Sequence, residues 1–191
     1  MTMQRDDVLR AVAEKRDDAI VVATMTTLVP WRGFSPSELN IGCVGFMGGA
    51  SGLGLGLALA QPERKVLVLD GDGSLLMQLG SLATIAGAAP PNYVHFLFHN
   101  GVYETSGAQT IPSEGRIDFA RMARAAGYKS AHTFDDLEDL RTSLDAVLHE
   151  EGPVFVELKV EPAGSFYSGS TRSITFADEA KQMREALGRP F

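Results

Sequence analysis

The chain has 191 residues, 45% of them hydrophobic and 21% charged, with a formal net charge of −7. This length suits one domain with a buried core, and the negative charge argues against a nucleic-acid partner bound through a basic surface. The single Cys43 excludes an intrachain disulfide framework and a cysteine-rich metal site. The polar N-terminus is no signal peptide, and the longest near-apolar segment, 53–60, is too short to cross a bilayer. We therefore expect a cytoplasmic protein without a membrane segment.

Helical and strand patterns alternate along the chain, which predicts an α/β fold: a doubly wound, mostly parallel sheet with helices on both faces. In chain order we expect a helix at about 5–16, a strand at 19–23, a loop at 25–40, a strand at 41–44, a helix at 48–61, a strand at 65–70, a helix at 79–88, a strand at 93–99, a loop at 101–116, a helix at 117–126, a strand at 128–133, a helix at 135–150, a strand at 154–160 and a helix at 178–187. The whole of 1–191 is then one domain, with an irregular tail and a terminal helix from about 161.

The segment 48–61 is rich in glycine, which lowers helix propensity, so we expect its glycines to allow a close approach to the sheet. The surrounding run 42–56 lacks both the Gly-x-Gly-x-x-Gly and the Gly-x-x-x-x-Gly-Lys patterns, which argues against dinucleotide and P-loop nucleotide sites. Gly45, Gly48 and Gly49 can still present backbone N–H groups to an anion. Packing of the helix on the sheet is the alternative explanation for these glycines.

Polar residues follow two of the expected strands. Gly71-Asp72-Gly73 comes directly after the strand at 65–70, and His99-Asn100 ends the strand at 93–99. The carboxyl ends of strands form the edge at which open α/β sheets bind ligands. An aspartate oxygen, an asparagine oxygen and a backbone carbonyl suit Mg²⁺, which usually keeps waters and phosphates as further ligands. The spacing therefore predicts a metal-bridged diphosphate site, with a simple tight turn at 71–73 as the alternative.

Together with Gly45-Phe46-Met47-Gly48, these motifs resemble the diphosphate-binding domain of thiamine-diphosphate enzymes, whose signature is Gly-Asp-Gly followed at a distance by Asn-Asn. His99 stands in place of the first asparagine. The resemblance implies that Asp72, Asn100 and the backbone oxygen of Val102 bind Mg²⁺, and that Met47 holds thiamine diphosphate in its V-shaped conformation. The other residues expected at the cofactor or substrate are Thr24, Gly45, Phe46, Gly71, Gly73, Ser74, Tyr103, Glu104 and Thr105.

Within that family the chain looks like phosphonopyruvate and sulfopyruvate decarboxylases. The similarity is carried by segments 58–66, 80–85 and 100–102, while 106–109 looks like the group's Gly-Gly-Gln segment. It runs from about residue 6 to residue 160, which is most of the chain. Departures from the group's usual pattern fall at 24–27, at Phe46 and Gly49, and in the tail at 164–172. All are expected near the substrate pocket.

Thiamine-diphosphate enzymes need a second domain that binds the aminopyrimidine ring and supplies an activating glutamate. Glu14, Glu38, Glu63 and Glu104 all fall within the pattern of a single domain, so we expect that glutamate on a separate chain. The resemblance thus implies a pyrimidine-binding α-type subunit, a hetero-oligomer, and a cofactor that lies across the interface.

The expected function is the diphosphate-binding subunit of a two-chain decarboxylase that depends on thiamine diphosphate and Mg²⁺ and acts on a small 2-oxo acid. A subunit of an acyloin-type carboligase with the same cofactor is one alternative. A non-catalytic ligand-binding or regulatory module is another.

A few further residues have two interpretations. Arg32 and Arg172 could pair with an acidic substrate group, although a solvated surface position is the simpler expectation for each. Trp31 could anchor an interface or pack locally. His95 alternates within an apolar strand, which favours a structural role.

Overall fold

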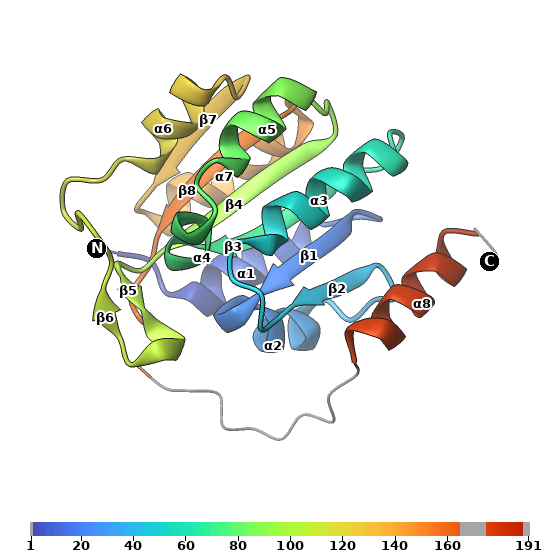
Figure 1. The fold of residues 1–191 in the computed structure, drawn as a ribbon, viewed down its shortest axis with the longest axis horizontal. Helices are drawn as coiled ribbons and strands as arrows, with labels where there is room; N and C mark the ends of the chain where they lie inside the picture. The colour runs from blue at the N-terminus through green and yellow to red at the C-terminus, as the bar shows by residue number, and fades with distance from the viewer. Residues whose placement is uncertain (1, 165–174, 189–191) are drawn as a thin grey trace.

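Six parallel strands form the central sheet of the computed structural model, which describes residues 2–164 and 175–188 (Figure 1). Their order across the sheet is β2-β1-β3-β4-β8-β7. The strands are β1 (Ile20–Thr24), β2 (Asn40–Cys43), β3 (Val66–Gly71), β4 (Tyr93–His99), β7 (Ser130–Phe134) and β8 (Val154–Lys159). The central strands are buried on both faces, which explains their continuous apolar sequences. The predicted α/β fold is therefore confirmed.

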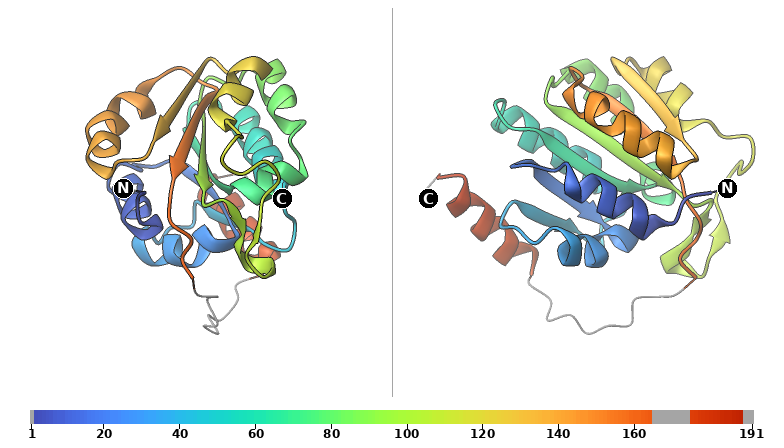
Figure 2. Two further views of the ribbon diagram at one scale, coloured as in Figure 1. Left: turned by 90° about the vertical axis from the view of Figure 1, so that its left-hand side faces the viewer. Right: turned by 180° about the vertical axis from the view of Figure 1, so that it is seen from behind.

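Helices cover both faces of the sheet, as the two further views show (Figure 2). One face packs against α1 (Arg5–Glu14), α2 (Met25–Phe34) and α7 (Leu137–His149). The other face packs against α3 (Gly49–Ala60), α5 (Ser81–Ala88) and α6 (Phe119–Ala126). The terminal α8 (Phe176–Ala186) lies beside the edge strand β2 (Figure 1). Among the described residues, no helix is both long enough and apolar enough to span a bilayer.

Local sequence signals explain where several helices begin. The Asp136 side chain accepts hydrogen bonds from the backbone N–H groups of Glu138 and Asp139, so it caps α7. Leu140 and Leu144 then bury one face of that helix against the sheet. The glycines of α3 are explained in part, because a Cβ on Gly54 would come within 2.3 Å of a Val68 methyl. A close approach of helix and sheet is therefore required at that position.

The prediction of a loop over 25–40 is wrong for residues 25–34, which form α2. Pro30 and Gly33 disfavour a helix, and they produced the error. Leu28 and Trp31 are buried in the core on this face, and the Thr27 hydroxyl donates to the Thr24 carbonyl at 2.8 Å. Burial of these side chains outweighs the low helix propensity of the segment.

Two smaller elements are also absent from the sequence prediction. Helix α4 (Asp72–Met77) starts directly after β3, where Gly71-Asp72-Gly73 resembles a tight turn. The long segment 101–116 contains a short hairpin of β5 (Val102–Tyr103) and β6 (Gln109–Thr110), joined through a 3₁₀ turn at Glu104–Ser106. The terminal helix is confirmed, whereas Arg172 and most of the tail at 164–172 lie outside the described residues.

The register of the sheet brings the polar motifs to one edge. Ala23 of β1 pairs with Leu69 of β3, and Gly71 of β3 pairs with Phe98 of β4. His99 of β4 in turn pairs with Lys159 of β8. Because all these strands are parallel, the residues that follow β1, β3 and β4 meet at the same carboxyl edge.

Candidate functional site

Asp72 joins the two sequence motifs at the carboxyl edge of the sheet. It is the first residue of α4, and it is 2% exposed. Its Oδ2 accepts a hydrogen bond from the backbone N–H of Gly101 at 2.7 Å, and its Oδ1 accepts from that of Gly73 at 2.6 Å. The carboxylate that follows β3 is thus bonded directly to the turn that follows β4.

The environment of Asp72 favours a nearby cation. Burial raises the pKa of this carboxyl, while the backbone N–H groups of Gly101 and Gly73 and the charge of His99 act in the opposite direction. A buried carboxylate without a full counter-charge is unfavourable, and a metal ion beside it would offset that cost. The electrostatics therefore agree with the predicted metal site.

Asn100 and Val102 are the other residues predicted to bind the metal. The Asn100 Oδ1 accepts a hydrogen bond from the Val102 N–H at 3.0 Å, and its Nδ2 donates to Glu104 Oε2 at 2.8 Å. Carboxylate, amide and backbone carbonyl oxygens are the hard donors that Mg²⁺ takes. In residues 2–164 and 175–188, no group of three or more His, Cys, Asp and Glu side chains could hold a metal ion. The predicted donors include an amide oxygen and a backbone carbonyl oxygen, which are outside the set of side chains counted in such groups.

The start of α3 lies beside this edge, but the Gly49 N–H that was predicted to face an anion donates to the Phe46 carbonyl at 3.1 Å. The N–H of Gly48 donates to the Ser74 hydroxyl of α4 at 3.0 Å, which links the glycine-rich turn to the Asp72 helix. The ring of Tyr103 lies on Gly73, where a Cβ would come within 2.5 Å of it. Helix α3 begins at Gly49, directly after this turn, and a helix N-terminus favours phosphate groups.

Other predicted cofactor residues lie around this edge. The described structure shows no hydrogen bond between their side chains and Asp72. Thr24 ends β1, and its buried hydroxyl donates to the Cys43 carbonyl at 2.7 Å. Met47 is half-buried in the turn before α3, whereas Gly45 and Thr105 are exposed. Gly71 ends β3 next to Asp72. The structure therefore brings these residues to one edge of the sheet. Hydrogen bonds join Asp72 to Gly73 and to Gly101, and a further one joins Asn100 to Val102.

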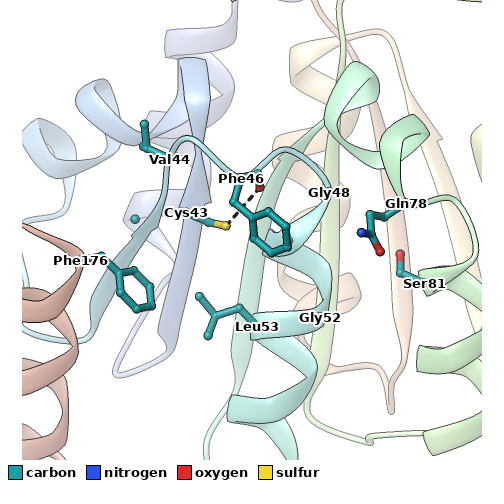
Figure 3. A pocket seen from close by; sticks show the side chains of 11 residues that line it. Cys43, Val44, Phe46, Gly48, Gly52, Leu53, Gln78, Ser81 and Phe176 are labelled. Atoms are coloured by element: carbon teal, nitrogen blue, oxygen red, sulfur yellow. Dashed lines mark hydrogen bonds between the residues drawn. The ribbon is translucent and has the colours of Figure 1, made fainter.

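Phe46 lines a cavity beside the start of α3. Its side chain is 60% exposed, and its ring lies over Gly49 in a cavity of about 530 Å³. Figure 3 shows Phe46, Leu53 and Phe176 around this apolar hollow, with Cys43 at its base. Gly48 and Gly49, which were considered for an anion site, line the same cavity.

The residues with two interpretations are resolved where the structure describes them. Arg32 forms an ion pair with Glu179 of α8, so its charge is used within the chain. Trp31 is fully buried, and its Nε1–H donates to Asn40 Oδ1 at 3.0 Å, which is local packing. His95 is buried between Asp70 and Tyr128, with a ring nitrogen 3.3 Å from a side-chain oxygen of each. The structural role expected for His95 is thus supported.

A buried charged group next to Asn100 escaped the sequence analysis. His99 Nδ1 lies 2.7 Å from Glu157 Oε1, and its Nε2 lies 3.0 Å from Glu114 Oε2. Burial alone would lower the pKa of His99, but the two carboxylates raise it above its ordinary value. Lys159 Nζ also contacts Glu157 Oε1 at 2.6 Å. A charged Glu157 within the apolar strand 154–160 was the signal available in the sequence.

A family model identifies the family of this domain. The model described as "Thiamine pyrophosphate enzyme, C-terminal TPP binding domain" matches residues 22–158, which is most of the chain. The chain belongs to the thiamine pyrophosphate enzymes. The prediction of thiamine diphosphate as the cofactor is therefore confirmed at the level of the family.

Two named relatives of this thiamine pyrophosphate domain are decarboxylases. The phosphonopyruvate decarboxylase of Streptomyces viridochromogenes is 39% identical over 189 residues, covering 95% of this chain and 45% of the relative. Sulfopyruvate decarboxylase subunit beta of Methanothermobacter thermautotrophicus is 34% identical over 173 residues, covering 86% of each. The chain thus spans less than half of the first relative and most of the second.

A solved structure agrees with the fold. The thiamine diphosphate-dependent 4-hydroxybenzoylformate decarboxylase of Rhodococcus jostii matches with a TM-score of 0.71 and 23% identity, covering 86% of this chain and 34% of that one. At this identity the match concerns the fold of the thiamine pyrophosphate domain. The resemblance expected from the Gly71–Asn100 motifs is confirmed.

Proposed function

We propose that the chain is the diphosphate-binding subunit of a two-chain decarboxylase that acts on a small 2-oxo acid with thiamine diphosphate and Mg²⁺. The observation that carries this proposal is the hydrogen bond between Asp72 Oδ2 and the Gly101 N–H, which holds the carboxylate beside the Asn100–Val102 turn. The names of two relatives, a phosphonopyruvate decarboxylase and a sulfopyruvate decarboxylase beta subunit, support the reaction type.

In this proposal the chain binds the phosphate end of the cofactor. Asp72, the Asn100 Oδ1 and the Val102 carbonyl hold Mg²⁺, while Gly73 and Ser74 face the diphosphate. When bound, thiamine diphosphate supplies the electron sink for the loss of CO₂. The chain's own residues bind and orient the cofactor and reduce the access of water to its phosphate end. The glutamate that activates the aminopyrimidine ring comes from the partner subunit.

The apolar cavity beside α3 supports a partner subunit. Val44 is 62% exposed and Phe176 is 55% exposed, and both line the cavity together with Phe46 and Leu53. A protein that works alone rarely leaves several large apolar side chains together at its surface. We propose that the pyrimidine-binding subunit covers this cavity, because the beta-subunit relative matches this chain over most of its length and is named as one subunit of an enzyme.

Calorimetry on the complex of the chain with its partner subunit tests the cofactor assignment. Asp72→Asn keeps the shape of the side chain but removes the charge, so Mg²⁺-dependent binding of thiamine diphosphate should weaken ~100-fold or more. The control is Asp17→Asn, which removes the same charge from an exposed turn at the opposite end of β1. Equal binding by Asp72→Asn and wild type would contradict the metal assignment.

Product analysis separates decarboxylation from the carboligase alternative. The same complex is given 2-oxo acids with and without an acceptor aldehyde. Release of CO₂ and an aldehyde, with no carbon–carbon product when the acceptor is present, supports the decarboxylase. Formation of an acyloin as the main product would contradict it. No turnover and no cofactor binding by the complex would favour the non-catalytic module.

A further inference from the structure

We propose that Glu104 and Glu114 are positioning residues that hold the metal-ligand turn, His99 to Gly101, from its two sides. The two carboxylates belong to one chain excursion, 101–116, which leaves the turn and folds back over it. This inference rests on the proposed function, because it concerns how the chain presents Asn100 and Val102 to Mg²⁺. Each glutamate acts through a residue of the turn.

Glu104 fixes which atom of the Asn100 amide faces the metal site. The Asn100 Nδ2 donates to Glu104 Oε2 at 2.8 Å, and its Oδ1 accepts from the Val102 N–H at 3.0 Å. Rotating the amide by half a turn would place Oδ1 against a carboxylate and Nδ2 against an N–H donor. Both contacts would be repulsive, because a carboxylate only accepts and an amide nitrogen only donates. Glu104 therefore keeps the amide oxygen available as a metal ligand.

Glu104 is itself held in place. Its second oxygen, Oε1, accepts a hydrogen bond from the backbone N–H of Gly164 at 3.0 Å. Gly164 follows β8, so the carboxylate links the 3₁₀ turn at 104–106 to the segment that leaves the last strand. A carboxylate with both oxygens bonded has little freedom to rotate, which makes it a suitable support for Asn100.

Glu114 holds the other side of the turn. Its Oε2 lies 3.0 Å from His99 Nε2, while Nδ1 of the same ring is bonded to Glu157 of β8. The Phe119 ring packs edge-on against His99, with centroids 5.1 Å apart. The imidazole is therefore fixed at both nitrogens and on one face, and Glu114 is fixed to it.

The Glu114 carboxylate also lies directly on Gly101. A Cβ at Gly101 would come within 2.9 Å of the Glu114 Cδ, and Gly101 has a φ of +77°, which glycine adopts readily. The N–H of this same glycine donates to Asp72 Oδ2, and its carbonyl accepts from the buried Ile111 at 3.0 Å. Glu114 thus covers the peptide that connects Asp72 to the turn.

The test measures binding of Mn²⁺, as a probe for Mg²⁺, in the presence of thiamine diphosphate. Electron paramagnetic resonance reports free and bound Mn²⁺ on the full chain co-purified with its partner subunit. Glu104→Ala and Glu114→Ala should each bind Mn²⁺ about ten- to a hundredfold more weakly, the usual effect of losing a residue that supports a metal ligand. The thermal unfolding midpoint without cofactor shows that each variant is folded.

The conservative variants separate positioning from simple charge attraction. Glu114→Gln keeps an oxygen that accepts the same hydrogen bond but loses the negative charge, so affinity should return to within about threefold of wild type. Glu104→Gln keeps the bond from Asn100 but loses the one from Gly164, so its affinity should lie between those of Glu104→Ala and wild type. Glu38→Ala removes an equal charge from an exposed turn and should have no effect.

Each outcome decides between the two proposals. Wild-type affinity in both alanine variants would overturn the positioning role of Glu104 and Glu114 and leave the proposed function intact. Equal losses in the glutamine and alanine variants would also overturn it, because charge alone would then explain the effect. No Mn²⁺ binding by the wild-type complex would overturn the proposed function, and with it the positioning role of the two glutamates.

Discussion

The two faces of the sheet differ in how fully helices cover their apolar side chains. On the face covered by α1, α2 and α7, large side chains such as Trp31 and Phe96 are fully buried. On the other face, α3 and α8 leave an apolar cavity with Val44, Phe46 and Phe176 exposed around it. We call the first the closed face and the second the open face. Both faces bury large side chains, since Phe119 and Phe155 are fully buried on the open face, but only the open face has apolar surface that the described residues leave uncovered. If the proposed partner subunit covers the open face, the residues around the cavity should matter more for assembly than for folding.

Trp31→Ala tests the closed face and should have the largest effect on stability. The side chain is fully buried, and its removal leaves a cavity and takes away the donor to Asn40 Oδ1. We expect a loss of about 3–5 kcal/mol in the free energy of unfolding, measured by urea titration with circular dichroism. Trp31→Phe is the matched control, since it keeps an aromatic ring and should lose less. A loss below about 1 kcal/mol would show that this face is not the main source of stability.

Phe46→Ser tests the open face and should affect assembly instead. Phe46 is 60% exposed, so the free energy of unfolding of the isolated chain should change by no more than about 0.5 kcal/mol. Binding to the partner subunit, followed by sedimentation velocity, should weaken at least about tenfold, as for an aromatic residue at an interface. Met122→Ser, at an exposed position of α6, is the control. Unchanged assembly in Phe46→Ser would place the partner elsewhere.

Glu150→Gln changes a residue beside the edge strand β7, away from Trp31 and from the cavity at Phe46. Of the three substitutions it should have the smallest effect on stability. Partial burial alone would raise the pKa of Glu150, but hydrogen bonds with Ser130 and His132 hold it below its ordinary value. A lowered pKa means that the carboxylate stabilises the fold above its unfolded pKa of about 4.3, and that this contribution is lost as the pH falls through the folded pKa.

Urea titrations at several pH values check this prediction. The wild type should be slightly more stable than Glu150→Gln at pH 6, and the difference should shrink steadily as the pH falls below about 4. A difference that grows on acidification would contradict the assignment.

Local sequence patterns predicted the sheet and half of the site. The apolar strands before Asp72 and Asn100 identified both residues, because a polar side chain directly after a buried strand must lie at the carboxyl edge. Helix α2 was missed because Pro30 and Gly33 disfavour helix, and only tertiary burial of Trp31 reveals it. Burial of this kind depends on the packing of α2 on its neighbours, which no local pattern contains.

The partners of His99 could not be predicted for a different reason. Glu114 lies 15 residues away in a loop, and Glu157 lies 58 residues away on another strand. Their contacts depend on the β4–β8 register and on the path of the excursion 101–116. Likewise, no residue pattern shows that the Phe46 ring lines the cavity beside α3. Long-range register and side-chain direction are therefore what the structure adds.

The position of β8 sets the order in which the site can form during synthesis. β8 comes last among the strands in the chain, yet it lies between β4 and β7 in the sheet. Its Glu157 holds His99, and the residue Gly164 just beyond it holds Glu104. A nascent chain that ends before β8 therefore has Asp72, Asn100, Glu104 and Glu114, but it lacks the groups of Glu157 and Gly164 that hold His99 and Glu104 in place. Metal and cofactor binding should consequently be a late event, coupled to closure of the sheet rather than to the earlier appearance of the ligands.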